Sequence, residues 1–339
     1  MAHNITDTDA TFSVRRPAWH GLSHVYDDYP TVEEARQLAH NWEPVTEPLF
    51  RRVPSITETG DLTEHYEEVE SHKAIVRSDN SATLGVTGKD YEPVSNKTLY
   101  EIAEVVQGQG SEVRLETGGS LKGGKSVWLL LRLNEPLQIK GDPVGDTVAY
   151  FALQNSHDGS SSFRGQACNT RIVCQNTSYA ADLEAARRGT EVVFRHTANV
   201  HDRIEEAKEA LAGWREDVQR WRLAQEHLLS VRVTDQQREL FITEFIPMPT
   251  RGIVSERVRT NVETAQGELR GILNSVTCQD TKHTAYGLVQ ASIEYQQWVR
   301  RVNGADNRDR AESRFRRSYM GRDKIIVDAA DLAVAVSTS

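Results

Sequence analysis

Residues 119–126 read GSLKGGKS, which fits the phosphate-binding loop pattern G-x-x-x-x-G-K-[ST]. Such a loop holds phosphates with successive backbone amides and with a helix that starts directly after the Lys-Ser pair. Here VWLLLRLNEP follows Ser126, and this short apolar run ended by Asn and Pro predicts a buried strand. We therefore interpret the glycines as a turn between two strands, with Lys122 and Lys125 at its tip.

Polar side chains with potential for chemistry concentrate in the stretch QNSHDGSSSFRGQACNTRIVCQNTS, which begins at Gln154. His157 beside Asp158 has the composition of a metal-ligand pair or of a base with its orienting carboxylate. Neighbours on a strand point to opposite faces, but DGSS is a turn signal, and a turn would let both address one site. Cys174 would act as a nucleophile if a base lowered its pKa, whereas a cysteine after Ile-Val is more often a small buried hydrophobe. The candidates for a ligand site or a structural cluster are Asn155, His157, Asp158, Ser160, Cys174, Gln175 and Asn176.

Four cationic side chains are candidates for contacts with a phosphate backbone. Arg164 and Arg171 carry guanidinium groups, whose planar fork suits a phosphate or a carboxylate. Lys122 and Lys125 would act as point charges on the glycine turn. The alternatives are internal ion pairs for the two arginines and solvated side chains for the two lysines.

An aromatic pair and the charge distribution also bear on an anionic partner. Trp19 and His20 offer a surface on which a base could stack, or an anchor that ties the N-terminal tail to the core. The net charge of −9 argues against a protein covered with phosphate-binding residues. From Arg251 to the end, 14 Lys and Arg stand against 11 Asp and Glu, so the last part carries +3 and residues 1–250 carry −12. We expect a local basic patch.

Composition predicts a globular protein of the cytoplasm. No run of about 18 uncharged apolar residues occurs, and the N-terminus MAHNITDTDATFSVRR lacks the apolar segment of a signal peptide. The 3 cysteines are too few for a disulfide framework, and no C-x-x-C pair suggests zinc. We therefore expect reduced thiols, no metal, no cofactor and no membrane contact.

The elements that must position these residues predict an α+β fold: an antiparallel sheet with packed helices, followed by a helical C-terminal region. Strand-like runs are HKAIVRS, ATLGVTG, SEVRLETGGSL, KSVWLLLRL and DTVAYFAL, and SDNS marks a hairpin turn. Helices are predicted in TVEEARQLAH, with a capping box formed by Thr31 and Glu34, and in SNKTLYEIAEVVQ.

The pattern becomes helical after RIVCQNTS. A helix to about residue 188 and a strand in TEVVFRH are followed by a long amphipathic segment that starts near Val200. Three further helices are predicted in SERVRTNVETAQGELRGILNS, AYGLVQASIEYQQWVRRVN and RDKIIVDAADLAVAV. We therefore divide the chain into a flexible tail (1–16), an α+β core domain (17–200) and a helical region (201–339).

Several motifs together resemble the phage- and plasmid-encoded family known as domain of unknown function 932. They are W-H-G-L, Y-E-P-V-S-N, N-S-H-D-G-S-S and R-I-V-C-Q-N-T, in this order along the chain. The family's glycine turn before the V-W strand needs no phosphate-binding loop, so the resemblance supports the hairpin interpretation. The resemblance implies that the protein is encoded by a mobile element, that it works in the cytoplasm of a bacterial host, and that it has a role in replication, recombination or host takeover. The family name does not specify a biochemical activity.

From these observations we expect a DNA-metabolism protein that binds single-stranded DNA, an oligomeric recombination or annealing factor that breaks no bonds. Lys122, Lys125, Arg164 and Arg171 would contact the backbone. One alternative is a nucleotide- or metal-dependent hydrolase that uses Asn155, His157, Asp158 and Cys174. Another is a counter-defence or regulatory protein that binds a phage or host protein.

Overall fold

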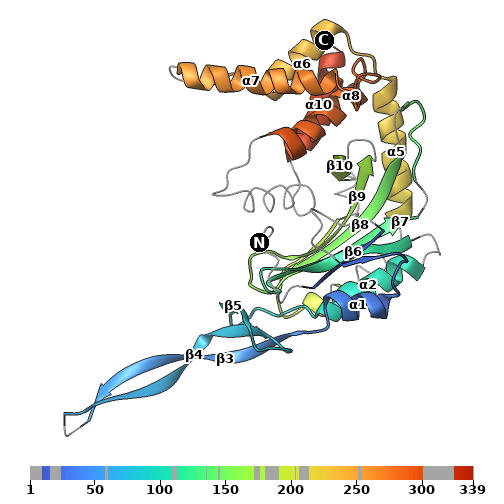
Figure 1. Cartoon of the computed structure of the whole chain (residues 1–339). Helices are drawn as coiled ribbons and strands as arrows, with labels where there is room; N and C mark the ends of the chain where they lie inside the picture. The colour runs from blue at the N-terminus through green and yellow to red at the C-terminus, as the bar shows by residue number, and fades with distance from the viewer. Residues whose placement is uncertain are drawn as a thin grey trace. The chain divides into compact units, whose positions relative to one another are not determined.

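A computed structural model describes most of the chain. The described residues are 10–15, 24–57, 60–108, 113–134, 136–143, 146–171, 176–179, 191–202, 204–205, 214–250, 254–300 and 324–338. They show the predicted α+β class, with antiparallel sheets, packed helices and several helices toward the C-terminus (Figure 1). Within these residues, no helix combines the length and the hydropathy needed to cross a membrane.

The strands form two sheets. The strands are β1 (Thr11–Val14), β2 (His24–Tyr26), β3 (Pro44–Ile56), β4 (Leu62–Arg77), β5 (Thr83–Gly88), β6 (Val113–Leu121), β7 (Ser126–Leu133), β8 (Thr147–Ser156), β9 (Phe163–Arg171), β10 (Asn176–Tyr179) and β11 (Glu191–Phe194). In the described part of the chain, the larger sheet has 8 strands in the order β10-β9-β8-β7-β6-β1-β2, with β11 beside β9. The smaller sheet has the order β3-β4-β5 and is antiparallel. All six predicted strand segments are confirmed, including TEVVFRH as β11.

The helices are α1 (Val32–Ala39), α2 (Asn96–Gly108), α5 (Trp214–Ser230), α6 (Asp235–Phe245), α7 (Glu256–Leu273), α8 (Ala285–Glu294), the π-helix η2 (Tyr295–Val299) and α10 (Lys324–Ser337). The predicted capping box of α1 is present: the Thr31 hydroxyl accepts from the Glu34 amide, and the Glu34 carboxylate accepts from the Thr31 amide. α1 and α2 pack on each other and on β6.

The glycine turn is a hairpin turn, as predicted. β6 ends at Leu121 and β7 begins at Ser126, so a strand follows the Lys-Ser pair where a phosphate-binding loop requires a helix. The backbone turns through positive φ at Lys122 (59°), Gly123 (72°) and Gly124 (97°). The glycines therefore serve the turn geometry.

Internal contacts divide the chain into two compact units. The first comprises residues 1–131, 152–165 and 192–212, and the second comprises residues 132–151, 166–191 and 213–339. Strands β7, β8 and β9 each contribute residues to both units.

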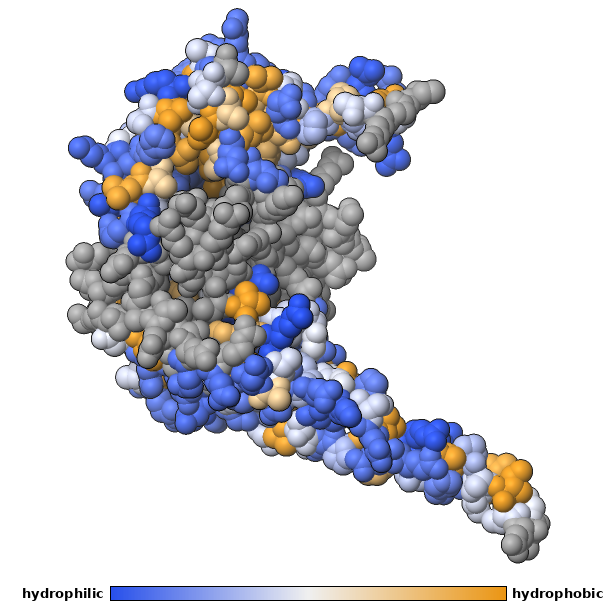
Figure 2. Space-filling model, turned by 180° about the vertical axis from the view of Figure 1, so that it is seen from behind, coloured by the Kyte–Doolittle hydropathy of each residue, from blue (hydrophilic) through white to orange (hydrophobic). Residues whose placement is uncertain are grey.

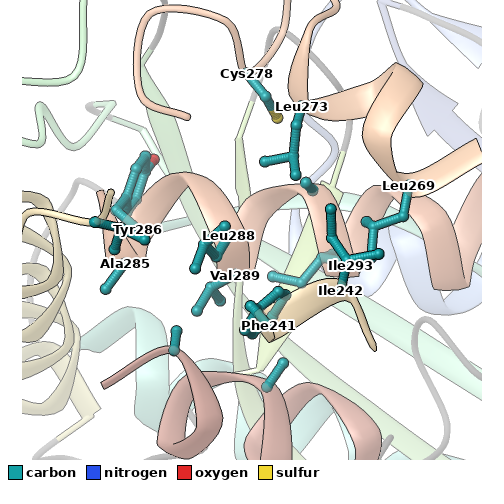
Figure 3. Packing of buried hydrophobic residues seen from close by; sticks show 14 of the residues in the cluster. Phe241, Ile242, Leu269, Leu273, Cys278, Ala285, Tyr286, Leu288, Val289 and Ile293 are labelled. Carbon is teal, nitrogen blue, oxygen red and sulfur yellow. The ribbon is translucent and has the colours of Figure 1, made fainter. Parts of the chain in front are cut away.

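The second unit is built around α8. Residues 285–293 are buried on every side, which is the pattern of a helix enclosed by others, and α5, α6, α7 and α10 supply the surrounding cluster. Figure 3 shows Phe241 and Ile242 of α6 near Ile293 of α8, with Leu269 of α7 beside them.

The sequence analysis missed α6, although Thr234 and Gln237 form its capping box. Its amphipathic pattern is weak because only Phe241 and Ile242 of its eleven residues are fully buried. A second prediction, the next helix, is tested at its first residue alone. The helix expected after RIVCQNTS meets strand β10 at Tyr179, and residues 180–190 lie outside the described part.

A matched pair of glycines tests the packing of α8. A Cβ on Gly287 would lie 2.1 Å from the Thr281 carbonyl oxygen, whereas a Cβ on Gly267 of α7 would meet nothing within 4 Å. We expect Gly287→Ala to lower the free energy of unfolding by about 2 kcal/mol or more. Gly267→Ala should raise it by about 0.5–1 kcal/mol, because Ala forms helices better than Gly. Thermal unfolding followed by circular dichroism measures both, and equal effects of the two substitutions would contradict this packing.

Candidate functional site

His157 lies at the centre of a buried polar cluster in the first unit. It follows the last residue of β8, and its side chain has 0% exposure. Its backbone N–H donates to the Lys125 carbonyl (2.8 Å), and its Nε2 lies 2.8 Å from Oδ1 of Asn96, the first residue of α2. Asn96 in turn donates from Nδ2 to the Trp42 carbonyl (2.8 Å), which fixes the orientation of its amide.

This orientation determines the tautomer of His157. Because Oδ1 of Asn96 can only accept, the His157 ring carries its proton on Nε2 and donates it. The other ring nitrogen, Nδ1, is then a bare acceptor, and it has no hydrogen-bond partner among the described residues.

Aromatic and cationic side chains enclose the imidazole. The Trp42 indole packs edge-on against His157, with ring centroids 5.5 Å apart. The buried guanidinium of Arg77, the last residue of β4, lies over the Trp42 ring at 4.3 Å. Arg77 also binds both carboxylate oxygens of Asp79 (2.9 and 2.7 Å) and donates to the Gly123 carbonyl (3.2 Å). Arg77 therefore joins the smaller sheet to the glycine turn.

The packing around Trp42 explains one glycine of GSLKGGKS. A Cβ on Gly124 would lie 2.7 Å from the Trp42 ring and 3.2 Å from a guanidinium nitrogen of Arg77. Gly124 also has φ of +97°, a region that other residues rarely adopt. Glycine is required here by a neighbouring side chain as well as by the turn.

A carboxylate from a distant segment caps α2. Glu43 accepts from the backbone amides of Asn96 (2.7 Å) and Lys97 (3.2 Å) and from the Ser95 hydroxyl (2.7 Å). A negative charge at a helix N-terminus is favourable because the unpaired amides point toward it. The segment around Glu43 is thereby fixed to the Y-E-P-V-S-N motif.

A second histidine ties the same motif to β11. The Glu92 amide donates to the His196 carbonyl (3.1 Å), and Nδ1 of His196 donates to the Glu92 carbonyl (3.0 Å). The His196 ring stacks on Tyr91 with centroids 4.6 Å apart, and the Tyr91 hydroxyl donates to the Ser156 carbonyl (2.8 Å). Nε2 of His196 has no partner within the described part of the chain.

A third histidine, His40, closes the cluster next to α1. Its Nε2 donates to the Gly119 carbonyl (2.8 Å), and its Nδ1 lies 2.6 Å from the hydroxyl of Tyr100 in α2. His40, Asn96, Tyr100 and His157 are all buried, so each of their hydrogen bonds replaces one with water.

Burial keeps His157 uncharged. Desolvation, together with a smaller repulsion from the nearby His196 and His40, lowers its pKa to about 3. Burial likewise lowers the pKa of His196, against a smaller opposing effect of its bond to the Glu92 carbonyl.

The geometry assigns His157 and Asp158 to different partners. Oδ1 of Asp158 accepts from the Ser160 amide (2.9 Å) and so stabilises the predicted DGSS turn. Asn96, which the sequence analysis did not single out, orients His157 instead. Among the described residues, no group of three or more His, Cys, Asp and Glu side chains could hold a metal ion.

Asn155 joins the cluster, and the other candidates are dispersed. Nδ2 of Asn155 donates to the Val94 carbonyl (3.1 Å), and Oδ1 of Asn155 accepts from the Ser156 amide (2.9 Å). Arg171 and Asn176 are paired in register across β9 and β10. Trp19, His20, Cys174 and Gln175 lie outside the described residues.

Sequence reasoning missed most residues of the buried polar cluster around His157. The missed residues are His40, Trp42, Glu43, Arg77, Asn96, Tyr100 and His196. Asn96 lies at the start of a predicted helix, Arg77 directly precedes the predicted SDNS turn, and Gly124 lies in the predicted glycine turn. One signal could have found them: Trp, His, Asn and Arg residues lie next to the predicted turns, and these residue types often form buried polar contacts.

The comparisons with known proteins define a family and no more. The chain belongs to the family described as Domain of unknown function (DUF932), whose model matches residues 83–319. No curated protein and no solved structure matches it. The matched segment holds Asn96, His157 and the glycine turn, whereas Trp42 and Arg77 precede it.

The buried state of His157 predicts a dependence of stability on pH. The unfolded chain binds a proton at this histidine near pH 6.5, whereas the folded protein binds it only near pH 3. Stability should therefore fall as the pH falls through this window, by up to about 1.4 kcal/mol per pH unit. Urea unfolding at a series of pH values measures the slope, and His157→Asn should reduce it.

Two controls accompany this measurement. His65→Asn removes an exposed histidine of the smaller sheet and should leave the slope nearly unchanged. Because His157→Asn also removes buried contacts, the His157 ring is followed by NMR in the unaltered protein. A ring that titrates near pH 6.5 in the folded state would show that the imidazole is not buried as described.

Proposed function

We propose that the protein binds single-stranded DNA through the phosphate backbone, as a recombination or annealing factor that breaks no bonds. The observation that supports this most directly is the position of two lysines on a rigid turn. Lys122 and Lys125 flank the tip of the β6–β7 hairpin and are partly exposed. The Lys125 carbonyl accepts from the buried His157 amide, and the Gly123 carbonyl accepts from Arg77, so the tip is held from both sides.

Arg164 belongs to the same end of the sheet. In the strand order, β8 lies between β7 and β9, so the start of β7, the end of β8 and the start of β9 are neighbours. Arg164 is the second residue of β9 and is partly exposed. Arg171 is the last residue of this strand, at its opposite end. The proposed contact surface therefore consists of Lys122, Lys125 and Arg164.

The charges fit a small phosphate-contacting surface. Among the residues that the structure describes, Lys125 has no ion-pair partner, so its ammonium group is available to an anion. Lysines contact phosphates as point charges without reading the sequence, and bases held by the backbone alone remain free to pair. The chain's net charge of −9 restricts such binding to a local patch.

The family adds a context to this proposal. The resemblance to proteins of phages and plasmids supports a role in DNA metabolism within a bacterial host cytoplasm. The buried, neutral His157 favours a binding function over acid–base catalysis by this motif, because a substrate cannot reach a side chain with no exposed surface.

Salt dependence tests the proposal. Fluorescence anisotropy of a labelled oligothymidine is recorded between about 50 and 200 mM salt. Each lost phosphate contact reduces the slope of log K against log salt by about 0.7 for a single strand, so Lys122→Ala with Lys125→Ala should reduce it by about 1.4. The control pairs Lys97→Ala with Lys140→Ala, two exposed lysines that do not belong to the turn, and should leave the slope unchanged.

Two results would contradict the proposal. One is the absence of binding at the lowest salt. The other is an equal loss of affinity in the turn variant and in its control, because net charge alone would then explain the binding.

A further inference from the structure

Part of the smaller sheet is a ribbon of two strands with no third strand beside it. β5 pairs with β4 only between His72 and Val76, whereas β3 and β4 stay paired along residues 50–56 and 62–68. We call these residues the arm, and Figure 1 shows it as the narrow end of the β3–β4 ribbon. Neither of its outer edges pairs with another described strand. Isolated two-stranded ribbons are marginally stable in water, so the arm benefits from a partner.

The register of the arm separates its side chains into two faces. Directly paired residues share a face, and the faces alternate along each strand. The pairs of one face are Phe50 with Glu68, Arg52 with Tyr66, Pro54 with Glu64, and Ile56 with Leu62. This apolar face holds all four large exposed hydrophobic side chains of the arm: Phe50 (52%), Tyr66 (70%), Ile56 (72%) and Leu62 (74%).

The opposite face is polar and largely satisfied by its own contacts. Glu67 forms an ion pair with Arg51 and lies 3.1 Å from His65, and the hydroxyl groups of Ser55 and Thr63 are 2.8 Å apart. Figure 2 shows apolar groups at the far end of the arm, among hydrophilic ones. The apolar face is therefore the part of the arm that would gain most from being covered by a partner.

The edges of the arm are protected against the addition of a further strand. Pro54 interrupts the row of N–H donors on β3, and proline is a common device for blocking an edge strand. The other strand of the arm, β4, carries Glu64, Glu67 and Glu68. A partner is thus expected to pack on the apolar face.

Charge restricts the kind of partner. Residues 50–68, which comprise the arm and the segment that joins its two strands, contain two arginines against five Asp and Glu and so carry −3. An acidic surface repels nucleic acid and anionic lipid. On the apolar face, Arg52 and Glu64 form an ion pair (3.2 Å) in the middle, with hydrophobic side chains at both ends.

We propose that the apolar face binds the same face of a second copy of this chain, with the two arms antiparallel about a two-fold axis. This arrangement places Phe50 of each copy against Ile56 of the other and the row of Arg52 and Tyr66 against the row of Pro54 and Glu64. Phe50 then packs on Ile56, and the Arg52 guanidinium faces the row that holds the Glu64 carboxylate, so the face complements itself except at Glu68, which lies opposite Leu62.

The size of the face sets the expected strength. Seven residue pairs at about 3.4 Å each give a face about 24 Å long and two strands wide. This is well below the roughly 800 Å² per partner of a standard stable interface. The dimer should therefore be weak and should depend on protein concentration in the micromolar range or above.

Two neighbouring residues test the face. Sedimentation velocity over a concentration series should show the unaltered chain converting from monomer to dimer. Tyr66→Glu places a carboxylate on the apolar face and should weaken dimerisation by about tenfold or more. His65→Glu adds the same charge one residue away on the polar face and should leave dimerisation nearly unchanged, since both positions are exposed.

Cysteine pairing tests the antiparallel arrangement. A mixture of Phe50→Cys and Ile56→Cys copies should form mixed disulfide dimers on mild oxidation, well above the level of either variant alone. The proposal is overturned if the unaltered chain stays monomeric at the highest concentration, if both glutamate variants dimerise equally, or if Phe50→Cys alone links as well as the mixture. Because the arm does not include Lys122, Lys125 or Arg164, DNA binding and dimerisation can fail independently.

Discussion

The hydrogen bond between His157 and Asn96 is the contact on which the first unit depends. Both side chains are fully buried, so a lost partner would leave a polar group without water, at a cost of about 1–3 kcal/mol. Asn96 holds the Trp42 carbonyl, and Trp42 packs on His157 and under Arg77. One bond thus fixes the relative positions of α2, the end of β8 and the start of β3. The surrounding contacts depend on that arrangement.

The same cluster gives the glycine turn its shape and its rigidity. Arg77 and the His157 amide bind two carbonyls of the turn, and Trp42 leaves room for nothing larger than Gly124. A rigid turn presents Lys122 and Lys125 with little loss of backbone freedom on binding, which favours contact with an extended phosphate chain. The buried cluster around His157 therefore positions the partly exposed Lys122 and Lys125.

The strand β4 shows how one element serves two environments. Its last three residues, Ile75, Val76 and Arg77, are buried in the first unit, whereas its first residues form the arm and are exposed. The inner end is tied to the cluster through Arg77, and the outer end is held by cross-strand ion pairs and, in the proposed dimer, by the apolar face of a second copy. The proposed DNA surface and the proposed dimer surface use different residues and are held by different contacts.

The sequence by itself determined the local structure of this protein. The run after Ser126 is apolar and short, so a strand had to follow the glycines, and Thr31 with Glu34 marked the start of α1. Local propensity and turn chemistry decide such features within a few residues. α6 escaped because its apolar pattern is weak, and strand β10, which forms at the end of RIVCQNTS, was not predicted because its backbone is satisfied by pairing with β9 and not by a local pattern. Only the tertiary structure decided which polar residues meet. Asn96 and His157 are 61 positions apart, as are Asn155 and Val94, and no local pattern encodes contacts at that separation.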